Sequence, residues 1–304
     1  MKLALLCSGQ GLQSAEMFRS TRDAPAAAPV FAAASKVLRD DPRSFVTSAG
    51  DRLFANRASQ ILCVTQALSA HACLLDVLPE RIVVAGYSVG EMAAWGIAGV
   101  WDVDATLTAV GARAESMDAA SAGDAGLGFV RGLARGAVAE LAARHDCEIA
   151  IIDPDLLFVV GGQRADLFRL CADASAAGAA RTGLLAVHIA SHTSALRAAV
   201  APFASALAAI PTNRPRRGTT LLSAIDGAPI FDPATGITIL ASQVGQMIDW
   251  AAVLAAMVEA GVDTVLELGP GTALVSMVRT SFPSLRARAF DDFRSLEGVR
   301  QWLG

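Results

Sequence analysis

The sequence predicts an α/β protein in which a larger domain, built on a parallel sheet, carries a small inserted subdomain. Short β-branched runs alternate with longer helical stretches, which is typical of a parallel sheet. After the small-residue stretch 121–126 the elements become shorter and follow the order β-α-β-β-α-β, the ferredoxin-like arrangement. The 304 residues are enough for one large domain with an insert.

The large domain is expected to begin with a buried strand, since five apolar residues precede the loop Ser8-Gly9-Gln10-Gly11. An apolar stretch then predicts a long buried helix, and a β-branched run predicts a second strand. Asp102 is a suitable first residue for a later helix. The predicted elements are the strand Leu3–Cys7, the helix Ala58–Leu78, the strand Arg81–Gly86, and the helices Val89–Ala98 and Val103–Ala120.

The insert is predicted to span residues 123–187, and residues 1–122 and 188–304 to form the large catalytic subdomain. Its predicted elements are the strand Gly128–Leu133, the helix Ala137–His145, the strands Glu148–Ile152 and Leu156–Val160, the helix Arg164–Ala176 and the strand Thr182–Val187. After the insert we expect a strand at Thr264–Leu268 and a helix from Thr272.

The composition excludes several classes of protein. Hydrophobic residues make up 53% and charged residues 18%, which excludes a disordered chain. No stretch reaches the ~18 apolar residues of a transmembrane helix. The net charge of −4 makes nucleic acid an unsuitable partner. Five cysteines in mostly apolar settings suit reduced thiols in a cytoplasmic protein, and His71 with Cys73 is too small a set for a metal site, so no metal is expected.

The segment Gly86-Tyr87-Ser88-Val89-Gly90 fits the pattern G-x-S-x-G and lies between a predicted strand and a predicted helix. In a nucleophile elbow the glycines give room for a sharp turn that presents the serine hydroxyl at the helix N-terminus. The backbone N–H of Val89 can then help to bind an oxyanion. We therefore predict that Ser88 is a nucleophile, against the simpler interpretation of a Gly-Ser turn.

A nucleophilic serine needs a base, and the chain has four histidines. His71 and His145 lie in predicted helices and are expected to be structural or solvated. His188 and His192 lie where the chain leaves the insert, and the residues alone leave both open as the base.

Two glycine-containing loops follow predicted strands. Gly9-Gln10-Gly11-Leu12-Gln13 resembles the start of a dinucleotide fingerprint, but Ser14 stands where the third glycine is needed. The alternative is a tight loop that presents a backbone N–H to the same oxyanion. The second loop, Glu267 to Thr272, is expected to be a glycine-lined turn.

Together these segments resemble the malonyl-coenzyme A:acyl-carrier-protein transacylases and the related acyltransferase domains of fatty acid and polyketide synthases. Six ordered matches carry the resemblance: the G-Q-G-x-Q loop Gly9 to Gln13, the serine motif Gly86 to Glu91, Arg113 with Met117, Ser191-His192, Gln243 to Trp250, and Gly269 to Gly271. The resemblance implies an α/β-hydrolase-like large domain with a ferredoxin-like insert.

Within the family, the chain looks most like the epsilon subunit of bacterial malonate decarboxylase. Tyr87 in the serine motif, Ala93 to Gly96, Ala190 to Thr193 and Ile225 to Pro229 point there. The acceptor would then be the decarboxylase carrier subunit with a dephospho-coenzyme A-type thiol. The alternative acceptor is an acyl carrier protein of fatty acid or polyketide synthesis, with a phosphopantetheine-type thiol.

The resemblance also implies a role for each matching residue. Ser88 is the nucleophile, His192 is the general base, and the backbone carbonyl of Gln243 orients the imidazole. Backbone N–H groups of Gln10 and Val89 form the oxyanion hole. Arg113 holds the free carboxylate of a malonyl group, because a guanidinium binds a carboxylate through two parallel hydrogen bonds.

The implied reaction transfers malonyl from malonyl-coenzyme A through a malonyl-serine ester to the carrier thiol, without a tightly bound cofactor. Two rival functions are a serine thioesterase or hydrolase and a non-catalytic carrier-docking subunit. Two departures from the family pattern stand out: Tyr87 in place of a histidine, and Asp153-Pro154-Asp155 in place of asparagine and serine. Tyr87 adjoins the serine, so it bears on the pocket wall, but the sequence leaves its effect open. An aspartate would disfavour an anionic acyl chain if it lay near the thioester, and the sequence does not place these aspartates.

Overall fold

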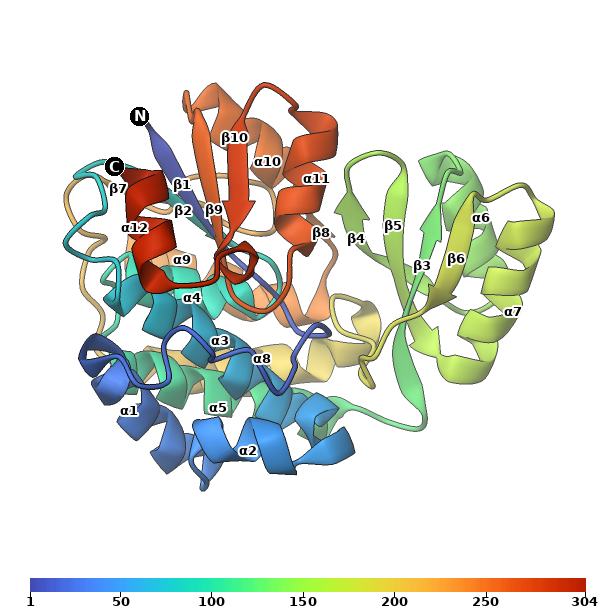
Figure 1. Ribbon diagram of the computed structural model, residues 1–304. Coiled ribbons are helices and arrows are strands. Elements are labelled where there is room, and N and C mark those ends of the chain that lie inside the picture. The colour runs from blue at the N-terminus through green and yellow to red at the C-terminus, as the bar shows by residue number, and fades with distance from the viewer.

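The computed structural model describes residues 1–304 and shows two lobes, each built on its own five-stranded sheet (Figure 1). The strands are β1 (Leu3–Cys7), β2 (Ile82–Gly86), β3 (Ala125–Arg131), β4 (Glu148–Asp153), β5 (Leu157–Gln163), β6 (Arg181–Leu184), β7 (Thr219–Leu221), β8 (Ile248–Asp249), β9 (Thr264–Leu268) and β10 (Arg286–Ala289). The α/β class, with a parallel sheet and a second mixed sheet, is therefore confirmed.

Helices follow most of the strands. The α-helices are α1 (Ala28–Leu38), α2 (Pro42–Ser48), α3 (Asn56–Ala72), α4 (Gly90–Ile97), α5 (Val103–Ala120), α6 (Arg135–Arg144), α7 (Arg164–Ala176), α8 (Arg197–Ala208), α9 (Pro233–Ser242), α10 (Trp250–Glu259), α11 (Ala273–Ser281) and α12 (Leu296–Leu303). Short 3-10 helices are η1 (Pro25–Ala27), η2 (Gly50–Phe54), η3 (Ser194–Leu196), η4 (Gln243–Gly245) and η5 (Phe290–Asp292). None of the helices combines the length and hydropathy that a membrane crossing requires.

The sheet of the larger lobe has the order β10-β9-β1-β2-β7 and is parallel throughout. Every residue of its central strand β1 is buried, because helices cover both faces. Leu3, Leu5 and Cys7 join one apolar cluster with α1, α3, α4, α5 and α8. Ala4 and Leu6 join another with α10 and α11 on the opposite face.

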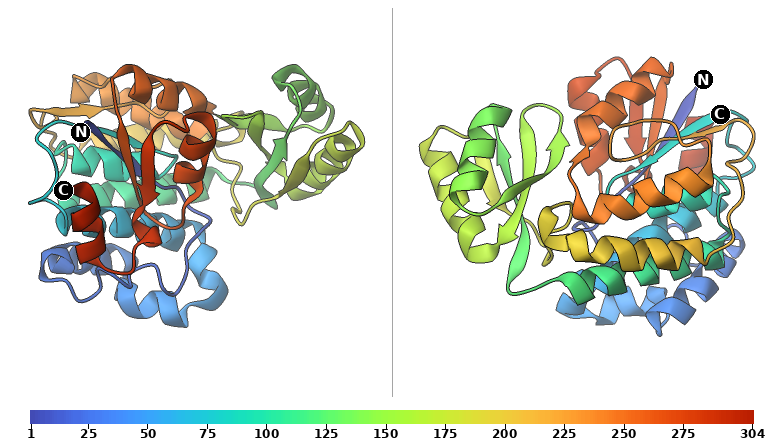
Figure 2. Two further views of the ribbon diagram at one scale, coloured as in Figure 1. Left: turned by 45° about the horizontal axis from the view of Figure 1, so that its top comes forward. Right: turned by 180° about the vertical axis from the view of Figure 1, so that it is seen from behind.

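The sheet of the smaller lobe has the order β6-β3-β5-β4-β8. Its first four strands are antiparallel, and their spatial order is the ferredoxin-like one. The fifth, β8, comes from chain beyond the insert and pairs in parallel with β4, Ile248 opposite Ile151. The larger lobe therefore contributes one edge of the second sheet. Figure 2 shows the smaller lobe set to one side of the larger lobe in both views.

Some element bounds differ from the sequence-based ones. The helix predicted to reach Leu78 ends at Ala72, where the chain continues in turns. The last strand of the insert ends at Leu184 rather than Val187, and Leu185 to Val187 form part of the connection back to the larger lobe. The domain boundaries at residues 123 and 187 stay a prediction.

Candidate active site

Ser88 lies on a tight turn between β2 and α4, at the carboxyl edge of the parallel sheet. Its φ of 54° is left-handed, a conformation that costs about 1–3 kcal/mol in a non-glycine residue. A Cβ on Gly86 would meet the backbone of Gly90 at 2.1 Å, and one on Gly90 would meet Cys7 O at 2.1 Å. Glycine is required at both positions, because a side chain on either residue would collide with neighbouring backbone.

His192 lies beside Ser88, although 104 residues separate them in the chain. Its Nε2 is 2.7 Å from Ser88 Oγ, and its Nδ1 donates to the backbone carbonyl of Gln243 at 2.7 Å. A carbonyl can only accept, so the proton is on Nδ1 and the lone pair is on Nε2. His192 is thus oriented to accept the Ser88 proton.

The electrostatic surroundings keep His192 neutral. The side chain is 1% exposed, and burial, followed by the positive charge of Arg113, lowers its pKa to about 3. A neutral imidazole is the form that a general base requires. His188 is exposed and makes no hydrogen bond with Ser88, so the structure brings His192 and not His188 to the serine.

Two backbone N–H groups are free near the serine. Those of Gln10 and Val89 donate to no other backbone group. Gln10 follows β1, and Tyr87 N donates to Cys7 O at 2.9 Å, so the loops after β1 and β2 lie side by side. The Gly9 loop bends at Gln10 and Gly11, and Gln10 lines the same cavity as Ser88 and His192.

Arg113, on α5, is 1% exposed. Its Nη1 donates to Gln60 Oε1 at 2.7 Å and its Nη2 to Gln243 Oε1 at 3.0 Å, whereas its Nε has no partner. Burial lowers the pKa of Arg113 to about 10, so the group stays charged at neutral pH. A buried guanidinium with unused donors can take a carboxylate from a ligand.

Gln243 connects the arginine to the histidine. Its backbone carbonyl accepts from His192, and its side chain accepts from Arg113 and donates to Glu91 Oε2 at 2.5 Å. Gln243 Nε2 also donates to Ser88 O at 3.2 Å. Burial raises the pKa of Glu91 to about 7, although Gln243 and the nearby Arg113 favour its charged form.

Two adjoining cavities open at this site. The smaller, of about 50 Å³, is lined by Ser88, His192, Ser191 and Gln10, and by apolar side chains, namely Leu127, Ile151, Val159, Leu185 and Val187, with Tyr87. The larger, of about 230 Å³, lies between the loop after β1, the start of α11 and the connection at Leu185 to Val187. Tyr87 and Gln10 line both cavities.

The two aspartates of the Asp153-Pro154-Asp155 segment line neither cavity. Asp153 is 3% exposed and accepts from Tyr87 Oη at 3.1 Å. Asp155 lies 3.8 Å from Arg131 and accepts from Ser281 at 3.4 Å. The sequence left the place of these carboxylates open, and the structure puts neither of them in the lining of the two cavities.

Glu267, at the end of β9, has a structural role. It is fully buried, accepts from the amides of Leu274 and Val275 at the start of α11, and accepts from Ser8 Oγ at 2.8 Å. It therefore fixes the glycine-lined loop 269–271 against the loop that carries Gln10. No group of three or more His, Cys, Asp or Glu side chains could ligate a metal ion.

Sequence reasoning assigned no role to Gln60 or Glu91 and did not pair Tyr87 with Asp153. Glu91 could have been noticed, since it is a charged residue in the first turn of the apolar helix that follows the serine. Gln60 had none, because a glutamine on a buried helix has no local pattern that reveals its partner. The Tyr87–Asp153 contact joins residues 66 positions apart and depends on how the lobes meet.

Comparisons with known proteins agree on one family, although no family model matches the chain. The chain is 32% identical over 294 residues to the malonyl CoA-acyl carrier protein transacylase of Mycobacterium tuberculosis, covering 94% of this chain and 95% of that protein. It is 30% identical to part of the polyketide synthase GfsB of Streptomyces halstedii, covering 91% of this chain and 5% of the synthase. The crystal structure of an acyl-carrier-protein S-malonyltransferase from Burkholderia pseudomallei superimposes with a TM-score of 0.91 at 26% identity, covering 99% of this chain and 100% of that one.

Proposed function

Because the chain belongs to the malonyl CoA-acyl carrier protein transacylase family, we propose that it moves a malonyl group from malonyl-coenzyme A to the thiol of an acyl carrier protein. The chain is an acyltransferase. The observation that carries the proposal is the shared use of Gln243, whose backbone orients His192 beside Ser88 while its side chain contacts Arg113. One residue thus links the reacting pair to a buried carboxylate-binding cation.

The first half of the reaction forms an acyl-enzyme. His192 Nε2 takes the Ser88 proton as Oγ attacks the thioester carbonyl carbon. The resulting oxyanion accepts hydrogen bonds from the Gln10 and Val89 amides, which are free for this purpose. The carbon–sulfur bond then breaks, and the leaving coenzyme A thiolate takes the proton from His192.

The second half repeats these steps with the carrier thiol as nucleophile. His192 takes the thiol proton, sulfur attacks the malonyl-serine ester, and the serine oxygen leaves with that proton. No metal or tightly bound cofactor takes part in this scheme. The larger cavity, which is mainly apolar and adjoins the serine, can admit the arm that carries either thiol.

Arg113 provides the selection for a dicarboxylic acyl group. The distal carboxylate of malonyl would bind the unused guanidinium donors, whereas an acetyl group would offer those buried donors no anionic oxygen. The side chain stays cationic at neutral pH despite its lowered pKa of about 10. This assignment and those of Ser88, His192, Gln10, Val89 and Gln243 are parts of the proposal.

The acceptor is proposed to be an acyl carrier protein of fatty acid or polyketide synthesis. The relatives named above are transacylases and a polyketide synthase, which favours this acceptor over the malonate decarboxylase carrier subunit. The decarboxylase carrier stays a prediction without support from the comparisons. Parallel transfer assays with a phosphopantetheine-bearing carrier and a dephospho-coenzyme A-type carrier separate the two.

A hydrolase is the second enzyme class to test. In the catalytic triad of a serine hydrolase a carboxylate orients the imidazole, whereas a backbone carbonyl occupies that position here. A hydrolase would release free malonate at the same rate with or without a thiol acceptor. For a transferase we expect product to appear on the thiol.

The direct test is the intact mass of the protein after mixing with malonyl-, methylmalonyl- and acetyl-coenzyme A in turn, with Ser88→Ala as the control. We expect a malonyl-sized adduct on the wild type alone. Folded wild-type protein that forms no adduct with any donor, or an equal adduct on Ser88→Ala, would contradict the proposal. A serine-directed fluorophosphonate then tests whether Ser88 is reactive at all.

A further inference from the structure

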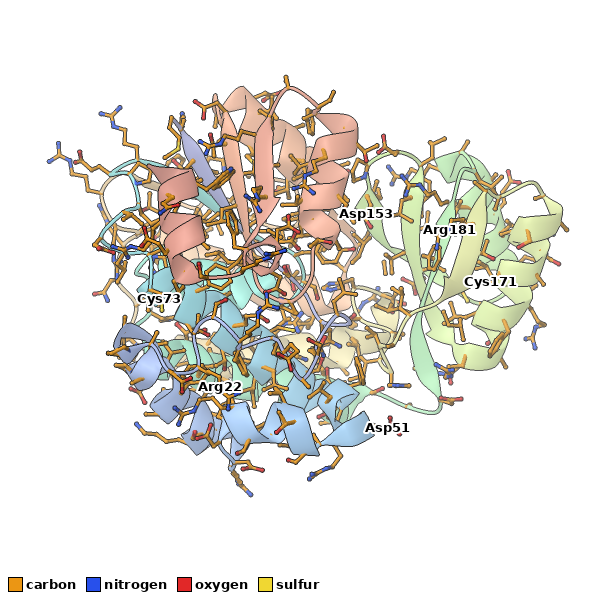
Figure 3. The ribbon with its side chains drawn as sticks, viewed as in Figure 1. Arg22, Asp51, Cys73, Asp153, Cys171 and Arg181 are labelled. Carbon is orange, nitrogen blue, oxygen red and sulfur yellow. The ribbon has the colours of Figure 1, made fainter.

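Tyr87 and Asp153 join the two lobes at the active site. Tyr87 lies on the turn that carries Ser88, at the end of β2 in the parallel sheet. Asp153 is the last residue of β4 in the second sheet, and Figure 3 shows it labelled between the lobes. Tyr87 Oη donates to Asp153 Oδ2 at 3.1 Å, so one hydrogen bond spans the gap between the sheets.

The contact is shielded from solvent, and it is the hydrogen bond that each of the two side chains makes. Asp153 is 3% exposed, and its Oδ1 has no hydrogen-bond partner. The Tyr87 ring packs edge-on against Trp250, with centroids 5.3 Å apart, and Trp250 is fully buried at the start of α10. Loss of the tyrosine hydroxyl would leave a buried carboxyl with no partner, which is costly unless the lobes move apart or water enters.

Other side-chain hydrogen bonds between the lobes lie at the exposed rim. Ser194 N donates to Glu148 at 3.0 Å, and Ser281 donates to Asp155 at 3.4 Å, both in exposed positions. The Tyr87–Asp153 bond differs because Tyr87 itself lines the cavity at Ser88. It is therefore placed to control the local spacing of the lobes where the acyl group would lie.

The cavity at Ser88 has walls from both lobes. Ser88, His192 and Gln10 belong to the larger lobe, and the second sheet supplies an apolar wall of three side chains: Leu127, Ile151 and Val159. The cavity is small, about 50 Å³, so its width depends on how closely this wall approaches the serine. A branch on the acyl chain next to the thioester carbonyl would point into that limited space.

We propose that the Tyr87–Asp153 hydrogen bond is a positioning contact that holds the second sheet close to Ser88 and thereby excludes acyl groups with a branch beside the thioester carbonyl. The inference rests on the proposed malonyl transfer and adds that methylmalonyl is rejected on size. One additional methyl group in a fitted apolar pocket changes selectivity by roughly 10–200-fold. The acyl class selected is thus a short, unbranched chain with a distal carboxylate.

The test compares kcat/KM for malonyl- and methylmalonyl-coenzyme A in the wild type and three variants. Tyr87→Phe keeps the ring but removes the donor, and Asp153→Ala removes the acceptor. Asp153→Asn keeps an oxygen that can accept from Tyr87 and is the matched control. We expect the malonyl preference to fall about 10-fold in Tyr87→Phe and Asp153→Ala, mainly through faster methylmalonyl transfer, and to be retained in Asp153→Asn.

A role in stability alone would lower both rates together and leave their ratio unchanged. An unchanged ratio in Tyr87→Phe, an equal loss in Asp153→Asn and Asp153→Ala, or a wild type that transfers methylmalonyl as well as malonyl would overturn the inference. If Tyr87→Phe does not fold, the two Asp153 variants provide the comparison.

If the proposed function itself is wrong, the experiments will give a different result. Wild-type protein that reacts with a fluorophosphonate at Ser88 but forms no malonyl adduct contradicts malonyl transfer itself, and the selectivity inference falls with it. A malonyl adduct together with an unchanged ratio contradicts only the role of the Tyr87–Asp153 contact.

Discussion

The two sides of the small cavity are built differently. On the side of the larger lobe, buried polar groups contact one another around Ser88: His192, Arg113, Gln243, Gln60 and Glu91. On the other side, the second sheet presents only apolar groups to the cavity. The larger lobe thus holds the groups that we propose transfer protons and bind the acyl carboxylate, and the smaller lobe provides an apolar wall.

The difference has a physical reason. Parallel strands end at one edge of a sheet, and the loops there bring backbone amides and helix N-termini together, which suits a developing oxyanion. The antiparallel sheet offers a regular surface of alternating side chains, which suits a packed wall. Substitutions on the two sides should therefore have different consequences.

The largest effect is expected from Ser88→Ala. Loss of the nucleophile should lower malonyl transfer roughly 10⁴–10⁶-fold, because no ester can form without the Ser88 hydroxyl. Intact mass and transfer to a carrier thiol measure this. Because Ser88 has a φ of 54°, Ser88→Gly is a matched control that removes the hydroxyl while relieving the backbone strain. Substantial transfer by either variant would contradict the assignment.

Arg113→Ala should cost roughly 10²–10³-fold in kcat/KM for malonyl-coenzyme A, by the loss of a buried charged contact. Transfer of acetyl, which has no distal carboxylate, should fall much less or increase. Arg113→Lys keeps the charge without the planar two-point contact and should fall in between. Equal losses for malonyl and acetyl would show that Arg113 acts only on the fold, through Gln60 and Gln243.

Val159→Ala changes only the apolar wall. We expect a malonyl kcat/KM within about 10-fold of the wild type, faster methylmalonyl transfer, and a loss of about 1–3 kcal/mol in unfolding free energy from the cavity left behind. Val138→Ala is a matched control, because Val138 is fully buried in the smaller lobe on the helix side, away from the cavity. Equal changes in acyl selectivity in the two variants would show that the apolar wall does not determine which acyl group is accepted.

The last change, at Asp153, should affect the rate of transfer least, and its main effect concerns the pH dependence of stability. Burial raises the pKa of Asp153 to about 7; Tyr87 opposes the rise, and the charge of Asp249 adds to it. A group with a raised folded-state pKa binds its proton more tightly in the folded state. The contribution of Asp153 to the free energy of unfolding therefore falls as the pH rises from about 4 to about 7 and stays constant at higher pH. Asp153→Asn does not titrate, so its stability relative to the wild type should increase over that range, by on the order of a few kcal/mol.

Denaturant unfolding of the two proteins at pH 5 and pH 8 measures this difference. Asp155→Asn, at an exposed position two residues away, serves as the control for the same change of side chain. A stability difference that is the same at both pH values would contradict a buried, protonated Asp153.

Much of the fold was predictable because its signals are local. The strand Leu3–Cys7 and the helix Val103–Ala120 have the predicted bounds, since an apolar run and an Asp102 cap define them within a few residues. The contribution of β8 to the second sheet was missed, because a two-residue strand carries no periodic pattern. The early end of α3 was also missed, since the apolar character continues past Ala72 into a turn.

The serine turn was likewise a local feature. Gly86 and Gly90 enclose Ser88 within five residues, and the sequence alone therefore determined the strand, the sharp turn and the helix that follow one another there. Ser88 and the histidine candidates came from the residues themselves, because a serine between two glycines and a histidine are chemically distinctive. Arg113 and Gln243 were named only through the family resemblance.

The residues themselves left His188 and His192 open, and the family resemblance favoured His192. The tertiary structure brings His192 Nε2 to 2.7 Å from Ser88 Oγ across 104 residues of chain, because its position depends on how the chain returns from the insert. It also decided that Gln243 links His192, Arg113 and Glu91, and that Asp153 faces Tyr87 instead of the acyl pocket. These contacts join separate elements through burial and hydrogen bonding. No local pattern encodes such contacts, because each depends on the packing of two lobes around one cavity.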